Sequence, residues 1–170
     1  MSPHPGASRR GALIALVLLV CAGLSVDVGA QPRRSAINRP QPTLRIEPLV
    51  IVTQRGPVRV QAEIADTERT RNVGMMWRTT MAPNAGMLFD FNPPRDVSFW
   101  MHNTLIPLDM IFIAPDGRII SIARSARPRD DTPIPSGGVV RGVLEMRGGR
   151  AAEIGILPGD RVRHRIFRSG

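Results

Sequence analysis

The sequence contains a single cysteine, Cys21, and no lysine. Cys21 lies in an N-terminal apolar run that we expect to be removed, so the mature chain would carry no thiol. That would exclude thiol nucleophiles, disulfide bonds and thiolate metal sites, and it suits an oxidising compartment. Because lysine is absent, the formal charge of +9 comes from arginine alone. The arginines are spread from Arg33 to Arg168 without a dense block, which argues against nucleic acid as a partner and favours anionic envelope material.

Several catalytic and cofactor-binding signatures are also missing. The chain has no phosphate-cradling glycine loop, no nucleophile elbow and no His-x-x-x-His zinc pair. It lacks the regular βα alternation of a nucleotide-binding sheet. The pairs Gly137-Gly138 and Gly148-Gly149 are isolated and predict turns. We therefore expect no cofactor and no metal, and the sequence does not decide whether the protein is an enzyme.

The N-terminus has the features of an export signal. Arg9 and Arg10 precede an apolar run over 11–26, and small residues follow up to Ala30. The run is about 16 residues, shorter than the roughly 20 that a membrane span needs. We predict a signal peptide over 1–30 that is cleaved near Ala30, and a periplasmic or secreted protein. The alternative is an uncleaved anchor, which would be its only association with a membrane.

The rest of the chain divides into a linker and one domain. Residues 31–43 are rich in Pro, Arg, Ser and Gln and predict a flexible linker. Residues 44–170 form the predicted domain, which is large enough to bury a hydrophobic core without disulfide bonds. The segment 124–138 holds three prolines, adjacent aspartates and a Gly-Gly pair. Such a long loop is a candidate flap over a binding site.

The domain is predicted to consist mainly of strands. Val58, Val60, Ala62 and Ile64 alternate with polar residues, which indicates a half-buried strand. By similar patterns and turn signals we predict strands over 49–53, 58–64, 87–91, 97–101, 110–114, 118–123, 139–146 and 161–167. Two short helical segments are predicted, from an Asp66 cap to about Trp77 and over 150–155. The expected fold is mainly β, a compact β-sandwich or barrel-like single domain with one or two short helices.

Four segments, taken in order, resemble one family of small bacterial and archaeal domains. These segments are Gly74-Met75-Met76-Trp77-Arg78; Gly86 to Phe91; Phe99-Trp100-Met101-His102-Asn103-Thr104 with Ile106-Pro107-Leu108-Asp109 and Ile111 to Ile113; and Val143 to Met146 with Gly155 to Asp160. Together they are similar to the DUF192 family, also called UPF0127, over roughly 48–167. The resemblance implies a mostly β, sandwich-like fold and commonly an export signal, and it implies no established activity. Two positions depart from the family pattern, since relatives more often carry Lys or Arg at His102 and Leu at Met75.

The segment around Trp100 is the candidate site. If Phe99 and Met101 point inward, strand alternation turns Trp100 and His102 to the other face. An exposed indole beside an imidazole, followed by Asn103 and Thr104, is typical of a ligand platform. In the alternative arrangement, the helix near Trp77 covers Trp100 and makes a second small core.

Two acidic residues, Asp109 and Glu145, have open roles. Asp109 either joins the candidate site or accepts backbone N–H groups at a turn. Glu145 interrupts an apolar strand, so it either faces water or is buried with Arg78 or Arg141 as its partner. If Asp109 and Glu145 converged beside His102, general acid–base hydrolysis would become feasible.

Methionine is frequent in the predicted domain, from Met75 onward. Together with His102, these methionines offer a candidate metal site. In an exported protein without cysteine, Met and His together can bind Cu(I). The alternative is that the methionines fill the core, and no repeated Met-x-x-Met pattern is present.

We predict a non-catalytic binding module for a small polar or carbohydrate-like envelope ligand. The predicted site residues are Trp100, His102, Asn103, Thr104 and Asp109, rimmed by Arg78 and Glu145. The alternatives are a cell-envelope hydrolase that uses Asp109, Glu145 and His102, and a periplasmic Cu(I)-binding protein. The sequence leaves the oligomeric state open.

Overall fold

A computed structural model describes residues 37–167 of the chain. The predicted signal peptide and residues 31–36 of the predicted linker lie outside the described residues. Within the described part, no helix is both long enough and apolar enough to cross a membrane.

The main element is a seven-stranded sheet in the order β6-β5-β8-β3-β2-β1-β9. Its strands are β1 (Ile46–Thr53), β2 (Gly56–Ala65), β3 (Ala85–Arg95), β5 (Leu108–Ile113), β6 (Ile119–Ala126), β8 (Val140–Arg147) and β9 (Arg161–Arg163). Only β2 and β3 pair in parallel, and α1 (Glu68–Val73) lies between them in the chain. The remaining elements are the short strands β4 (Ser98–Phe99) and β7 (Ile134–Pro135), which pair with each other, and helix α2 (Arg150–Glu153).

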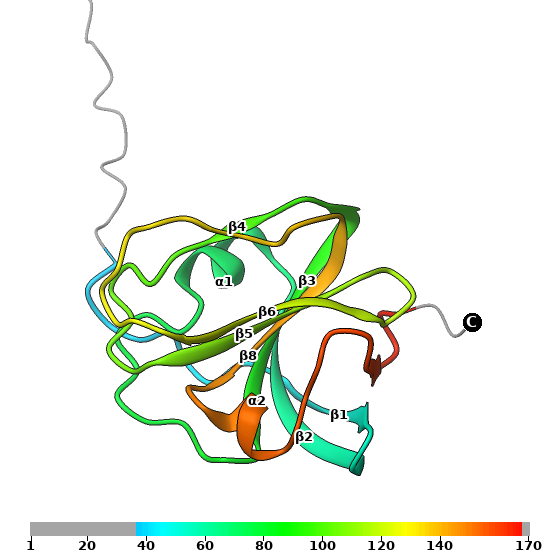
Figure 1. Cartoon of the computed structure of the whole chain (residues 1–170). Coiled ribbons are helices and arrows are strands. Elements are labelled where there is room, and N and C mark those ends of the chain that lie inside the picture. Colours follow the sequence, from blue (N-terminus) through cyan, green and yellow to red (C-terminus); the bar gives the residue numbers. More distant parts are fainter. Residues whose placement is uncertain (1–36, 168–170) are drawn as a thin grey trace, which may run out of the picture. The chain divides into compact units, whose positions relative to one another are not determined.

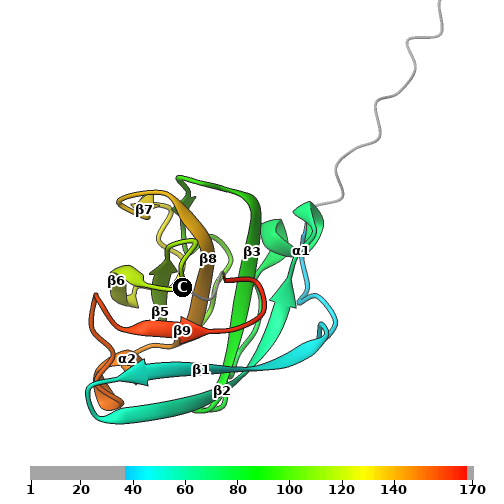
Figure 2. The ribbon, with the colours of Figure 1, turned by 90° about the vertical axis from the view of Figure 1, so that its right-hand side faces the viewer.

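The sheet curls into a half-barrel (Figures 1 and 2). Its outer strands approach each other where Arg118 forms an isolated bridge with Arg161. The amide of Val162 donates to the carbonyl of Gly117 at 2.8 Å, and the amide of Ile119 donates to the carbonyl of Asp160 at 2.8 Å. The predicted fold, a mainly β, barrel-like single domain with short helices, is confirmed.

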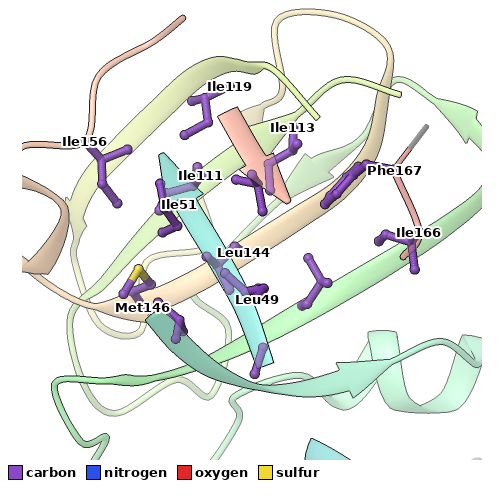
Figure 3. Packing of buried hydrophobic residues seen from close by; sticks show 14 of the residues in the cluster. Leu49, Ile51, Ile111, Ile113, Ile119, Leu144, Met146, Ile156, Ile166 and Phe167 are labelled. Atoms are coloured by element: carbon purple, nitrogen blue, oxygen red, sulfur yellow. The ribbon is translucent and has the colours of Figure 1, made fainter. Parts of the chain in front are cut away.

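The curled sheet encloses the first of two hydrophobic clusters, which we call the inner cluster. Figure 3 shows ten of its residues by name, among them Leu49, Ile111, Leu144 and Phe167. All seven strands contribute side chains to it. Each large apolar side chain that is fully buried there stabilises the fold by roughly 1.5–3 kcal/mol.

The second cluster, the outer cluster, lies on the opposite face of β3, β5 and β8. Strand alternation separates the two, since Leu88 belongs to the inner cluster whereas its neighbours Met87 and Phe89 belong to the outer one. Met75, Met101 and Met110 are also buried in the outer cluster. This is the core-filling arrangement of methionine, and Phe99 of β4 packs against the same cluster.

Helix α1 is shorter than expected and is capped by another residue. Thr67, not Asp66, is the N-cap: its Oγ1 accepts from the amide of Thr70 at 3.1 Å, and the Thr70 hydroxyl accepts from the amide of Thr67 at 3.0 Å. The helix ends at Val73, not near Trp77, because Gly74 and Trp77 both adopt positive φ, 48° and 64°. A Cβ at Gly74 would also lie 3.1 Å from the Phe89 ring.

Replacing Thr67 by Ala is expected to destabilise the protein by about 1 kcal/mol, because both hydrogen bonds of the capping box are weakened or lost. Thermal or urea unfolding followed by circular dichroism measures the change. Thr67→Ser keeps the hydroxyl and should retain most of the stability. Equal stability of Thr67→Ala and the unmodified protein would contradict a stabilising cap.

Two predicted elements beside the site differ in the structure. The strand expected over 97–101 is reduced to β4, and the predicted loop 124–138 is not open. Its first residues extend β6 to Ala126, and β7 pairs with β4. The amide of Met101 donates to the carbonyl of Asp130 at 2.8 Å, and the amide of Arg129 donates to that of Met101 at 3.1 Å. These backbone bonds hold the loop against the segment that carries Trp100.

The described end of the predicted linker contacts the domain. The Trp77 indole Nε1 donates to the carbonyl of Ile37 at 2.8 Å, and the Gln41 amide donates to the carbonyl of Gly74 at 2.9 Å. Residues 37–43 contain no helix or strand. They nevertheless lie against the C-terminal end of α1.

Candidate functional site

A cavity of about 620 Å³ lies between α1 and β4, above the outer cluster. We call it the α1–β4 groove. Its polar and charged lining residues are Glu68, Arg71, Asn72, Arg95, Asp96, Ser98, His102, Thr104 and Glu145; its apolar lining includes Val73, Met75, Met76, Phe89, Phe91, Val97, Phe99 and Trp100. Of the predicted site residues, the groove brings together Trp100, His102, Thr104 and Glu145. Asn103, Asp109 and Arg78 do not line it.

Glu145 lies at the base of this groove. On β8 it is in register with Met87 of β3 on one side and Met110 of β5 on the other, and both belong to the outer cluster. Glu145 is only 4% exposed, and its Oε2 has no hydrogen-bond partner among residues 37–167. Burial without a compensating charge raises the pKa of the Glu145 carboxyl from 4.5 to about 8.

The partners expected for Glu145 are engaged elsewhere. Arg78 forms a two-pronged ion pair with Glu63, at 2.6 and 2.8 Å. Arg141 pairs with Asp90. The expectation that Glu145 is either solvated or ion-paired is therefore wrong on both counts. At pH 7 the Glu145 carboxyl is mainly protonated, so it can donate one hydrogen bond and accept others from a molecule in the groove.

Trp100 forms one rim of the groove and is 54% exposed. Its ring lies 5.2 Å from that of His102, and His102 Nδ1 is 2.9 Å from Asp131 Oδ1. Phe99 instead packs edge-on against Phe89 with ring centroids 5.0 Å apart. The expected alternation therefore holds at Phe99 and Trp100, and the structure has the exposed arrangement of Trp100, not the one in which the helix covers it.

Asn103 and Thr104 have structural contacts. The carbonyl of Asn103 accepts from the amide of Trp77 at 2.8 Å, with Asn103 at φ 54°. This bond ties the turn after α1 to the segment that follows Trp100. Thr104 is 5% exposed, and its hydroxyl donates to the carbonyl of His102 at 3.4 Å. Thr104 thus supports the backbone below His102, and Asn103 is not part of the groove wall.

Asp109 is on the other side of the sheet. It is fully buried and in register with Met146 of the inner cluster, whereas Glu145 faces the outer cluster. Its carboxylate accepts from the backbone amides of Ser125 at 2.7 Å, Gly149 at 3.1 Å and Ala151 at 2.7 Å. Asp109 therefore has the alternative role predicted for it, that of an acceptor for backbone N–H groups, and it does not line the groove.

These positions also correct the two alternative functions. Asp109 and Glu145 lie on opposite faces of one sheet, so they do not converge beside His102 as the hydrolase requires. Met101 is buried in the outer cluster, whereas the His102 side chain is 44% exposed beside Asp131, and this arrangement does not support a copper site formed by the two. In residues 37–167 no group of three or more His, Cys, Asp or Glu side chains is placed to hold a metal ion.

Sequence reasoning missed two arginines, Arg71 and Arg95, that line the groove. The Arg71 and Arg95 guanidinium carbons lie 5.6 and 4.9 Å from the centroid of the Phe91 ring. Arg71 is in α1, whereas Arg95 ends β3 after two prolines. No spacing rule connects them, and only the placement of α1 over β3 brings both to Phe91.

Comparisons with known proteins agree with this fold. A crystal structure of a protein of unknown function from Novosphingobium aromaticivorans DSM 12444 is 42% identical and covers 74% of this chain and 91% of that one, with a TM-score of 0.71. A structure from Sinorhizobium meliloti 1021, described as a proposed transcription regulator, is 38% identical and covers 75% of this chain and 99% of that one, with a TM-score of 0.72. No curated protein matches the sequence. The model of the DUF192 family, described as "Uncharacterized ACR", matches residues 50–164. The chain therefore belongs to the DUF192 family.

Proposed function

We propose that the protein is a non-catalytic binding module and that the α1–β4 groove holds a small polar or carbohydrate-like ligand. The single observation that carries this proposal is the buried Glu145 carboxyl, which lines the cavity and whose Oε2 has no hydrogen-bond partner in residues 37–167. An unpaired buried polar group reduces stability, so a role in binding is a physical reason for its presence.

The size and lining of the groove support a ligand of this kind. Small-molecule sites typically enclose about 300–1,000 Å³ and combine apolar walls with a few polar groups, and the groove of about 620 Å³ has both. Trp100 offers a flat face for a sugar ring or another planar body. Glu145 at the base offers a hydrogen bond that would fix the orientation of the ligand.

Replacing Trp100 by Ala is expected to weaken ligand binding at least about tenfold, because the aromatic wall of the groove is lost. The stability of the fold should change by about 1 kcal/mol or less, since Trp100 is 54% exposed. Native mass spectrometry of protein purified from cells that express the full chain would first reveal a retained ligand. Isothermal titration with neutral and acidic monosaccharides would then measure affinity.

A matched control is Leu157→Ala, which removes another exposed apolar side chain that does not line the groove. This variant should bind as the unmodified protein does. If Trp100→Ala binds every retained or titrated compound as tightly as Leu157→Ala, the platform function of Trp100 is refuted. If Trp100→Ala unfolds, Trp100 is required for the core, and the exposed position described above is refuted.

The proposal does not include DNA binding, although one relative is described as a proposed transcription regulator. The helices in residues 37–167 span six and four residues, which is short for a helix that reads the major groove.

We also propose that the chain is exported and that residues 1–30 are its signal peptide. N-terminal sequencing of the protein recovered from the periplasm tests this, with Gln31 as the expected first residue.

A further inference from the structure

We propose that the ligand of the α1–β4 groove carries an anionic oxygen group, a carboxylate or a phosphate, which Arg71 and Arg95 hold beside Phe91. This inference rests on the proposed binding function, because it names the chemical class of the ligand for the same groove. It goes further because it places a negative charge of the ligand beside Phe91.

The first argument is the placement of two positive charges on one aromatic ring. Both guanidinium groups line the groove, and both lie within 5.6 Å of the centroid of Phe91. The pKa of Arg71 is lowered, chiefly by burial and next by the charge of Arg95. Two like charges held near each other repel, and an anion bound between them would remove that repulsion.

The second argument is that both guanidinium groups retain free donors. Arg71 uses Nη1 to donate to the backbone carbonyls of Asp66 at 2.6 Å and Asp90 at 2.9 Å. These bonds orient Arg71 without neutralising it. Arg95 is exposed, and within residues 37–167 its guanidinium group forms neither a hydrogen bond nor an ion pair, only its contact with Phe91. A carboxylate or phosphate is the group that guanidinium donors bind best.

The third argument concerns the carboxylates nearby, Glu68 and Asp96. Both line the groove and both are exposed, and in the described part of the chain neither accepts a hydrogen bond from Arg71 or Arg95. Asp66 and Glu68 raise the pKa of Arg71, but more weakly than burial and Arg95 lower it. These acids disfavour an extended polyanion at the rim. They leave room for a single anionic group that reaches between the two guanidinium groups.

The other lining residues, Trp100 and Glu145, indicate the chemistry of the rest of the ligand. Trp100 would stack on its body, and Glu145 would bond a hydroxyl, carbonyl or amide group at the base of the groove. A molecule with one acidic group on a small polar ring satisfies all three contacts. Acidic sugars and sugar phosphates both belong to this class.

The test uses the full-chain protein labelled with ¹⁵N and two probes, inorganic phosphate and acetate, titrated at constant ionic strength with chloride as the balancing anion. The side-chain Nε–Hε resonances of arginine report binding. We expect the resonances of Arg71 and Arg95 to shift and saturate with at least one probe. Arg95→Gln should weaken that binding about tenfold, as loss of a charge-assisted hydrogen bond predicts. Arg95→Lys, which keeps the charge, should restore part of it.

Arg59→Gln is the matched control, because Arg59 is an exposed arginine on β2 that does not line the groove. Equal weakening by Arg59→Gln and Arg95→Gln would overturn the inference, since it would mean that the protein attracts anions only through its overall charge. Absence of saturation with both probes would overturn it as well. The larger probes glucuronate and glucose 6-phosphate should bind more tightly than glucose, and preference for phosphate or carboxylate would identify the source of the charge.

The result separates this inference from the proposed function. Trp100-dependent binding of a neutral sugar without any Arg95-dependent binding of anions would refute the anionic ligand and retain the binding module. Arg95-dependent binding of phosphate without any Trp100-dependent ligand would retain the anion site and refute the carbohydrate-like ligand.

Discussion

Glu145→Gln is expected to stabilise the protein by on the order of 3 kcal/mol at pH 7, which corresponds to a rise in Tm of about 10 °C. In the folded state the pKa of Glu145 is raised from 4.5 to about 8 by burial. At pH 7 the unfolded chain therefore carries an ionised Glu145 and the folded chain a protonated one. Folding at pH 7 therefore requires Glu145 to bind a proton, which costs free energy because pH 7 is above the unfolded pKa. Glutamine removes that cost and keeps the size of the side chain.

The pH dependence follows from the same shift. Below about pH 4.5 the carboxyl is protonated in both states, so Glu145→Gln and the unmodified protein should be equally stable. As the pH rises from 4.5 to about 8, the unmodified protein should lose stability relative to the variant, and above 8 the difference should level off. Urea unfolding of both proteins at pH 4, 6 and 8 measures it.

A contribution that cancels and one control variant make this result specific. Burial lowers the pKa of His164, which gives a stability that is present above the unfolded pKa of 6.5 and is lost as the pH falls through the lowered value. This contribution is common to both proteins and cancels in the comparison. Glu153→Gln changes an exposed, ion-paired glutamate and should be neutral or slightly destabilising. A pH-independent effect of Glu145→Gln would contradict the account of a buried neutral carboxyl.

Asp109→Ala is expected to destabilise the protein by on the order of 4 kcal/mol, because three buried or half-buried backbone N–H groups lose their acceptor together. The carboxylate joins three separate segments through Ser125, Gly149 and Ala151. Helix α2 has no side-chain cap of its own at Gly149, so Asp109 on β5 caps it from a neighbouring strand. Equilibrium unfolding in urea, followed by circular dichroism, measures the loss.

The stability of Asp109→Asn should lie between that of Asp109→Ala and that of the unmodified protein, since the amide retains one acceptor oxygen. Asp116→Ala is the matched control, an exposed turn aspartate whose loss should change stability by about 0.5 kcal/mol or less. If Asp109→Ala were as stable as Asp116→Ala but no longer bound ligand, Asp109 would be a site residue after all, contrary to its position on the face away from the groove.

Individual strands could be predicted from the sequence because the alternation of apolar and polar side chains depends on neighbouring residues only. The alternation over Val58 to Ile64 predicted the half-buried strand β2. For Trp100 the sequence left an exposed and a covered arrangement open, and the structure has the exposed one. The helix boundary was less accurate. Asp66 and Thr67 are both good caps by residue type, and the reciprocal bonds with Thr70 favour Thr67. Gly74 ends the helix earlier than its apolar spacing suggested, because it turns back against Phe89.

Acidic residues in apolar strands were recognised as unusual, but their environments were not predictable. Glu145 is buried because Met87 and Met110 flank it from two other strands, and Asp109 is bonded because α2 and β6 present their amides to it. Both strands are apolar on both faces, so the sequence alone could not separate the face that lines a groove from the face inside the half-barrel.

The mainly β, barrel-like domain and its membership of the DUF192 family could both be predicted from the sequence alone. These depend on local alternation, turn residues and short motifs, which a linear chain records directly. Only the tertiary structure decided that Glu145 faces a cavity without a partner, that Asp109 lies on the opposite face, and that Arg71 and Arg95 meet at Phe91. Burial and charge pairing are set by residues that are distant in the chain, and the curvature of the sheet determines which of them come into contact.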